Sequence, residues 1–181
     1  MPLTYKKIPE SDKEHVLKLI DIVLSGLPNP EFFIPYEQWE LDSLFDAEHY
    51  AHLYGAYDIC GGGNKLVGMS QLYVSAELYT LPSGTSGQPD FKQNFNINGP
   101  RVCEFGGNLV LPEYRRMGIT TNLGQRSINL AKKLKYDYVV ATVHVDNAPG
   151  HKVAEKLKLN LVGQKNLSNG FPCMVYQKKL R

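Results

Sequence analysis

The chain has 181 residues, of which 43% are hydrophobic. That is enough to bury a core, and it points to one domain over residues 1–181. The formal net charge of +2 is too small to indicate a nucleic-acid-binding surface. No apolar run is long enough to span a membrane, and the first residues lack the apolar segment of a signal peptide. We therefore expect a cytoplasmic protein with no nucleic-acid or membrane partner.

The first 50 residues predict one strand followed by two helices. A short strand is expected over residues 3–8. Ser11 and Glu14 then have the spacing of a capping box. Apolar residues recur at helical spacing over residues 12–24, and a second helix is predicted over residues 36–46.

The middle of the chain predicts a hairpin and a long connection. Residues 52–59 and 66–76 are rich in Tyr, Leu and Val, and the glycine-rich segment 61–64 joins them as a turn. Residues 77–100 contain many Gly, Pro, Ser and Asn residues and few apolar anchors. This segment is too long for an ordinary connection, so it is either a mobile insertion or a functional loop.

The second half alternates strands and helices. Strands are predicted over residues 101–111, 136–145, 161–166 and 171–179, and helices over residues 119–134 and 147–159. The nearly continuous apolar run of residues 136–145 is typical of a central strand buried on both faces. The order of elements predicts a mixed α/β sheet with helices on both faces.

Cysteine and histidine spacing argues against disulfides and metal sites. The cysteines Cys60, Cys103 and Cys173 lie far apart in apolar or strand-like runs. We expect buried free thiols in a reducing compartment. His49 and His52 have no cysteine or carboxylate at ligand spacing, so no metal is expected.

The segment EYRRMGITTN, residues 113–122, connects a predicted strand to a predicted helix. A strand that runs through a glycine turn into a helix leaves backbone amides unpaired beside the positive end of the helix dipole, which suits a phosphate. Gly118 permits close approach of an anion, while Arg115 and Arg116 add positive charge. The alternative is a well-capped helix start with two solvated arginines, and local sequence leaves both open.

Two motifs resemble those of the GNAT superfamily of acyl-CoA-dependent N-acetyltransferases. The family's Q/R-x-x-G-x-G/A signature matches Arg115, Gly118 and Thr120, with Thr in place of the usual small residue. Asn147-Ala148-Pro149-Gly150 followed by residues 155–159 is similar to the family's N-x-x-[AS]…E-K-L-G-F pattern. The resemblance implies a mixed, mostly antiparallel sheet of about seven strands, flanked by helices on both faces and splayed between strands 4 and 5.

The resemblance also implies acetyl-CoA as a co-substrate. In this family the turn amides hold the pyrophosphate and the fourth strand pairs with the pantetheine arm. The implied cofactor-binding residues are Asn108, Leu109, Val110, Arg115, Arg116, Met117, Gly118, Ile119, Thr120, Thr121 and Asn147. A bulge at Gly106-Gly107 suits the splay, and Asn147 also fits a helix N-cap, so that its two roles are compatible.

Glu104 is the candidate general base. It stands eleven residues before Arg115, which is the spacing of the catalytic glutamate in the histone-acetylating branch of the family. Apolar neighbours are expected to raise its pKa, although an outward-facing, solvated Glu is the alternative. By the same analogy, the backbone N–H of Val110 polarises the thioester carbonyl.

The family's usual general acid is missing. Many members have a tyrosine seven residues after the motif asparagine, where this chain has Ala154. Water can suffice because a thiolate is a tolerable leaving group, and His144 and His151 are further candidates.

The predicted function is transfer of an acetyl group from acetyl-CoA to a primary amine of a small molecule, amino acid or peptide, by direct attack in a ternary complex. Tyrosines near the second and third strands, with Trp39 and Phe33, could line a pocket for an acceptor that is not strongly charged; they are Tyr50, Tyr54, Tyr57, Tyr73 and Tyr79. A non-catalytic CoA- or acetyl-CoA-binding regulatory module is the alternative, and an unrelated nucleotide-binding fold is a third possibility. The resemblance also allows a homodimer.

Overall fold

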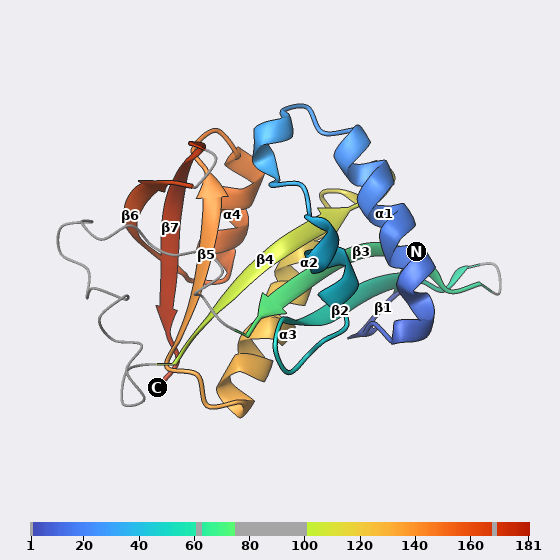
Figure 1. The fold of residues 1–181 in the computed structure, drawn as a ribbon, viewed down its shortest axis with the longest axis horizontal. Coiled ribbons are helices and arrows are strands. Elements are labelled where there is room, and N and C mark those ends of the chain that lie inside the picture. The colour runs from blue at the N-terminus through green and yellow to red at the C-terminus, as the bar shows by residue number, and fades with distance from the viewer. Residues whose placement is uncertain (1, 61–62, 75–100, 168–169) are drawn as a thin grey trace.

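The computed structural model describes residues 2–60, 63–74, 101–167 and 170–181. Within them, one mixed sheet has seven strands in the order β1-β2-β3-β4-β5-β7-β6 (Figure 1). The strands are β1 (Leu3–Lys7), β2 (Ala51–Asp58), β3 (Lys65–Tyr73), β4 (Val102–Val110), β5 (Tyr138–His144), β6 (Asn160–Asn166) and β7 (Pro172–Lys179). The helices are α1 (Lys13–Ser25), α2 (Gln38–Ser43), α3 (Ile119–Lys133) and α4 (Ala148–Lys156). Short 3-10 turns are η1 (Glu10–Asp12), η2 (Pro30–Phe32) and η5 (Pro112–Tyr114).

The helices cover both faces of this sheet. In Figure 1, α1 and α2 lie in front of the strands, and α3 and α4 lie behind them. One cluster of buried apolar side chains packs α1 and the start of α3 against β2 and β3. A second cluster packs the rest of α3 and α4 against β4, β5 and β7. The predicted fold class, a mixed and mostly antiparallel sheet between helices, is therefore confirmed.

The bounds of most predicted helices and strands agree with the structure to within about two residues. Strand β5 is an example in which the sequence pattern also predicted the position in the sheet. Its residues Val139, Val140 and Ala141 are each at most 6% exposed although they alternate between the two faces. The strand lies inside the sheet between β4 and β7, as its continuous apolar run predicted.

Two local predictions are wrong. Ser11 does not form the predicted capping box, because the chain enters α1 through η1 and Asp12 becomes the N-cap, without a side-chain cap. The Asp12 carboxylate instead accepts a hydrogen bond of 2.7 Å from the Tyr57 hydroxyl. Cys60 is exposed because it follows the end of β2, whereas Cys103 and Cys173 are buried free thiols as predicted.

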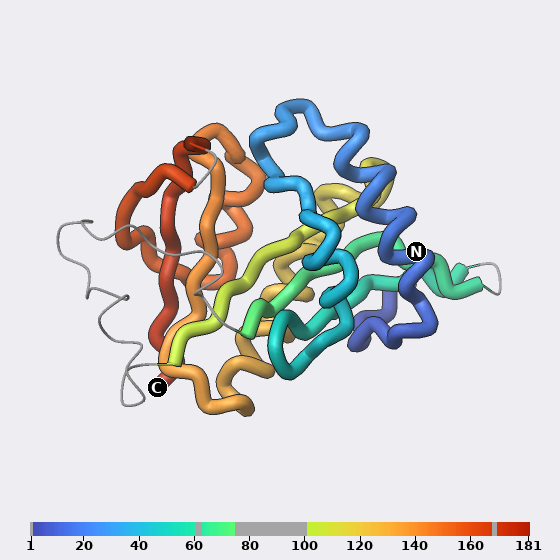
Figure 2. The backbone as a smooth tube through the Cα atoms, viewed as in Figure 1, coloured from blue at the N-terminus to red at the C-terminus, as the bar shows by residue number. Residues whose placement is uncertain are grey.

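The sheet opens between β4 and β5. These parallel strands pair only at Val102–Glu104, and the last pair is Glu104 with Val140. Beyond it the two strands diverge (Figure 2). On its other side, β4 has one more residue than β3 between the pairs Gln71–Gly106 and Met69–Leu109. This bulge contains Gly107 at a φ of +56°, so the predicted distortion and splay are confirmed.

No helix in these described ranges is both long and apolar enough to cross a membrane. The predicted segment 77–100 lies outside the described residues.

Candidate active site

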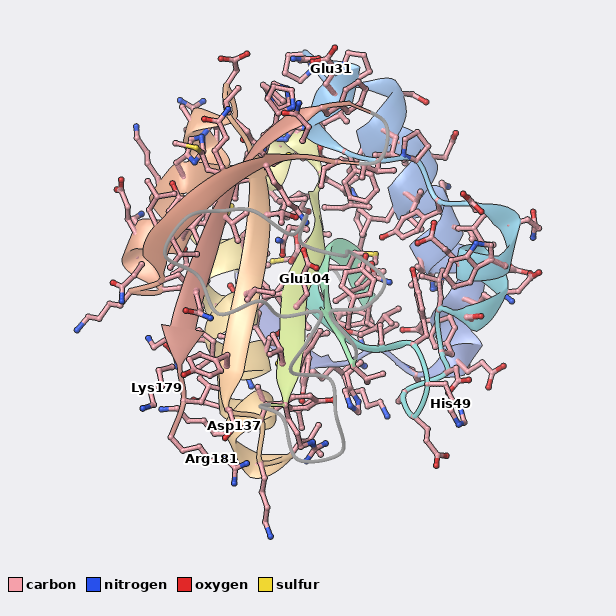
Figure 3. All side chains as sticks on the ribbon, turned by 60° about the vertical axis from the view of Figure 1, so that its left-hand side comes forward. Glu31, His49, Glu104, Asp137, Lys179 and Arg181 are labelled. Atoms are coloured by element: carbon pink, nitrogen blue, oxygen red, sulfur yellow. The ribbon has the colours of Figure 1, made fainter. Side chains whose placement is uncertain are left out.

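Glu104 lies at the point where β4 and β5 separate. Its neighbours Cys103 and Phe105 pack in the cluster with α3 and α4. Because side chains alternate along a strand, the Glu104 side chain lies on the other face, which α1 and α2 cover, together with that of its β3 partner Tyr73. Figure 3 shows Glu104 near the middle of the sheet, between Glu31 at one end and Asp137 at the other. The residue is 3% exposed, and its Oε1 accepts a 2.9 Å hydrogen bond from the Thr142 hydroxyl. The structure therefore rejects the solvated alternative.

Burial sets the protonation of this carboxyl. Desolvation raises the pKa of Glu104 to about 7, while the positive charge of Lys165 and hydrogen bonds from Thr142 hold it lower than burial alone would. Lys165 on β6 is itself 6% exposed, and desolvation lowers its pKa against the opposing effect of Glu104. A carboxyl whose pKa lies near neutrality exchanges its proton readily at neutral pH, which suits a group that takes up a proton.

A buried amide lies beside Glu104 on the same face. Gln71 on β3 has no exposed surface, and its Oε1 accepts hydrogen bonds from the hydroxyls of Tyr36 at 2.7 Å and Tyr73 at 2.6 Å. Tyr36 comes from the connection between α1 and α2, so this bond ties that connection to the sheet. The Tyr73 ring in turn contacts the Tyr50 ring edge-on, at 5.4 Å between centroids.

Only some of the tyrosines predicted to line an acceptor pocket lie near Glu104 and Gln71. Tyr57 belongs to the core, with its hydroxyl on Asp12. Trp39 contacts Tyr50 edge-on, and the Phe33 ring lies 5.3 Å from that of Tyr36. Tyr79 is outside the described residues. Tyr36, Gln71, Thr142 and Lys165 were not among the sequence candidates.

The glycine turn before α3, which the sequence predicts as a phosphate site, has backbone amides without partners among the described residues. Arg116 and Gly118 have left-handed backbones, with φ of 65° and 76°, and α3 starts without a side-chain cap. The backbone hydrogen bonds of the described residues include none donated by the amides of residues 116–121. Left-handed residues before a helix N-terminus form a concave group of N–H donors that fits a phosphate. The alternative of a well-capped helix start is therefore wrong, because α3 begins without a side-chain cap.

The side chains around this turn differ in exposure. Arg115, Arg116 and Met117 are exposed, and the Arg115 Nε donates to the Val110 carbonyl at 3.3 Å. Thr120 and Thr121 are half-buried, whereas Ile119 is buried in the core.

The other predicted cofactor residues flank the opening of the sheet. Asn108 lies in the β4 bulge, and its Oδ1 is buried without a hydrogen-bond partner among the described residues. Leu109 is 1% exposed, so its side chain is not available to a ligand. Asn147 is the N-cap of α4, as predicted, because its Oδ1 accepts the Gly150 N–H at 3.0 Å. The Asn108 Oδ1 and the amides of residues 116–121, which have no partner among the described residues, fit an extended ligand with amides and a pyrophosphate.

The two histidines considered as acids are engaged elsewhere. The His151 Nε2 donates to the Val145 carbonyl at 2.9 Å, and its Nδ1 lies 2.9 Å from the Tyr176 hydroxyl, so both ring nitrogens have partners. His144 has a 2% exposed side chain, accepts from the Asp146 N–H and contacts Glu31 at 3.2 Å. Ala154 is buried. No group of three or more metal-binding side chains occurs in the part of the chain that the structure describes.

The sequence profile of the acetyltransferase (GNAT) family matches residues 21–158. No curated protein matches the sequence significantly. The fold is similar to that of an N-acetyltransferase from Staphylococcus aureus Mu50, with a TM-score of 0.67, 16% identity and 100% of both chains covered. It is also similar to a chain of the NatC complex bound to Gag peptide and CoA, with a TM-score of 0.73, 16% identity and 100% of both chains covered. NAA60 of Arabidopsis thaliana, solved with a bisubstrate analogue, gives a TM-score of 0.71 at 15% identity over 98% of both chains. Because the profile covers most of the sequence, the chain belongs to the acetyltransferase (GNAT) family and is an acyltransferase.

Proposed function

We propose that this protein moves an acetyl group from acetyl-CoA to a primary amine by direct attack in a ternary complex. The observation that carries the proposal is the buried Glu104 carboxyl, with a pKa of about 7, at the point where the sheet opens. The amine nitrogen bonds to the thioester carbonyl carbon and the carbon–sulfur bond breaks. Glu104 accepts the proton that the amine loses. Water protonates the departing thiolate, since Ala154 offers no acidic group.

The proposed binding of acetyl-CoA, the acetyl donor, rests mainly on backbone groups. The amides of residues 116–121 and the N-terminus of α3 hold the pyrophosphate, with Arg115 and Arg116 adding charge. The backbone of residues 108–110 pairs with the amides of the pantetheine arm, and the Val110 N–H donates to the thioester carbonyl. Asn147 donates to the same arm through its Nδ2.

The proposal is tested by CoA release from acetyl-CoA with a panel of small amines, amino acids and peptides. Amine-dependent release by the purified protein supports it. Saturable binding of acetyl-CoA without release on any amine would instead favour the regulatory module. Absence of any stabilisation by acetyl-CoA in a melting experiment would contradict both.

The two roles assigned to Asn147 can be separated by substitution. Asn147→Asp keeps the oxygen that caps α4 but replaces the Nδ2 donor, so we expect unchanged thermal stability and about 5- to 10-fold weaker acetyl-CoA binding, measured by calorimetry. Asn147→Ala also removes the cap and is expected to cost about 1 kcal/mol of stability. Equal acetyl-CoA affinity of Asn147→Asp and the unmodified protein would restrict Asn147 to capping.

Activity is expected to depend on pH through Glu104. The base acts only when ionised, so kcat should rise with pH through about 7. Lys165→Met removes the charge that lowers the Glu104 pKa and is expected to move this rise to higher pH. Lys132→Met, which removes an exposed lysine on α3, is the matched control. Identical pH–kcat profiles for Lys165→Met and the unmodified protein would contradict the assignment.

A further inference from the structure

The Gln71 side chain has a hydrogen-bonding capacity that the described protein leaves unused. Both tyrosine hydroxyls bond its Oε1, at 2.7 Å from Tyr36 and 2.6 Å from Tyr73. These distances are typical of O–H···O bonds rather than N–H···O bonds, which supports the orientation of the amide. Its Nε2 is buried and has no partner among the described residues. A side-chain amide has two N–H donors, and neither finds an acceptor within the part of the chain that the structure describes.

An unpaired buried donor is costly, so its presence requires a reason. Leaving such a group without a partner costs about 1–3 kcal/mol. A Leu or Met at position 71 would avoid that cost, and neighbouring Met69 and Leu72 are buried without such groups. Tyr36, whose hydroxyl bonds the Gln71 Oε1, is half-buried on the connection between α1 and α2, so the Gln71 amide lies one side chain away from solvent. A carbonyl group of a ligand would supply the acceptor that the described residues do not.

The register places Gln71 at a fixed spacing from Glu104. Gln71 pairs with Gly106 and Tyr73 pairs with Glu104, so Gln71 and Glu104 are diagonal neighbours on one face of the sheet. The Cα atoms of diagonal neighbours lie about 7–8 Å apart, and side chains on one face of a sheet extend in the same general direction. In an α-amino carbonyl unit the nitrogen and the oxygen lie about 3 Å apart. With one hydrogen bond of about 2.9 Å at each end, such a unit has a reach of the same order as this backbone spacing, so it has the size to bridge the two side chains.

We propose that Gln71 is a specificity-determining residue that donates from Nε2 to a carbonyl oxygen of the acceptor, and that the acceptor is an α-amine bearing a neighbouring carbonyl group. Amino acids, their amides and peptide N-termini have this unit. In a simple alkylamine the carbonyl is absent, and in a lysine side chain it is too far from the amine to bridge the spacing. This inference rests on the proposed function, because it places the reacting amine at Glu104.

Equilibrium binding tests the inference separately from turnover. Leucinamide and 3-methylbutylamine differ by the carboxamide group alone, and their Kd values are measured by calorimetry on the protein saturated with CoA. We expect the unmodified protein to bind leucinamide about 10-fold more tightly. Gln71→Met is expected to reduce this preference to about 1-fold, while its Kd for 3-methylbutylamine changes by less than about 3-fold.

Tyr36→Phe is the matched control. It removes one hydrogen bond to Oε1 but leaves Nε2 in place, so the preference for leucinamide should persist. A preference that survives in Gln71→Met overturns the inference, and so does the lack of any preference in the unmodified protein. The lack of preference is measured on the unmodified protein, so it does not depend on whether a variant folds. If both amines bind with the expected preference but no amine releases CoA from acetyl-CoA, then the proposed function fails while the recognition by Gln71 stands.

Discussion

Glu104→Gln is expected to lower kcat by at least about 100-fold, which is the usual contribution of a general base. Glutamine has the shape of the glutamate and keeps an oxygen for the Thr142 hydroxyl, so the local packing is retained. It cannot take up the proton that the attacking amine loses. The measurement is steady-state CoA release at saturating amine.

The control for this variant is the affinity for acetyl-CoA. The cofactor residues proposed above lie on the turn, on the second half of β4 and at the N-cap of α4, and none of them is Glu104, so the Kd for acetyl-CoA should change by less than about 2-fold. A variant that retains half of the original kcat would show that Glu104 is not the base. A variant that loses acetyl-CoA binding as well would show that Glu104 shapes the donor site instead.

Gly107→Ala is expected to destabilise the protein by about 3–4 kcal/mol, more than any other single alanine proposed here. Gly107 has a φ of +56°, and a Cβ there would overlap Oε1 of Gln71 and lie 2.8 Å from its Cδ. Gln71 cannot easily move away, because Tyr36 and Tyr73 both hold its amide. The free energy of unfolding in urea measures the effect.

Gly170→Ala separates the two causes of this loss. Gly170 has a φ of +85°, but a Cβ there meets no atom of the described residues within 4 Å, so this variant shows the backbone strain alone, about 1 kcal/mol. In a Gly107→Ala background, Gln71→Ala should recover part of the stability because it removes the clash. Equal losses in Gly107→Ala and Gly170→Ala would mean that the bulge tolerates a side chain.

The sequence was most informative where local pattern determines structure. The apolar run of β5, the glycines of the β4 bulge and the glycine turn before α3 each require a particular backbone, and all three are where they were expected. The Ser11 capping box failed because a 3-10 turn, which spacing alone does not reveal, precedes α1.

The side chains beside Glu104 could not be predicted in the same way. The Tyr36–Gln71 bond joins residues 35 positions apart, and the Thr142–Glu104 bond joins residues 38 positions apart. Such contacts depend on strand register and on where a connection crosses the sheet, neither of which has a local signature. A signal did exist, since Gln71 and Thr142 are polar residues inside strands that are mostly apolar.

The burial of Glu104 also links folding to proton uptake. An unfolded chain releases this proton near pH 4.5, whereas the folded protein keeps it until about pH 7. The folded state therefore binds more protons between these values, and the free energy of unfolding falls as pH rises across that interval. The full difference is about 3 kcal/mol, present below pH 4.5 and lost above pH 7. The alkaline shift that ionises the proposed base thus weakens the fold that buries it.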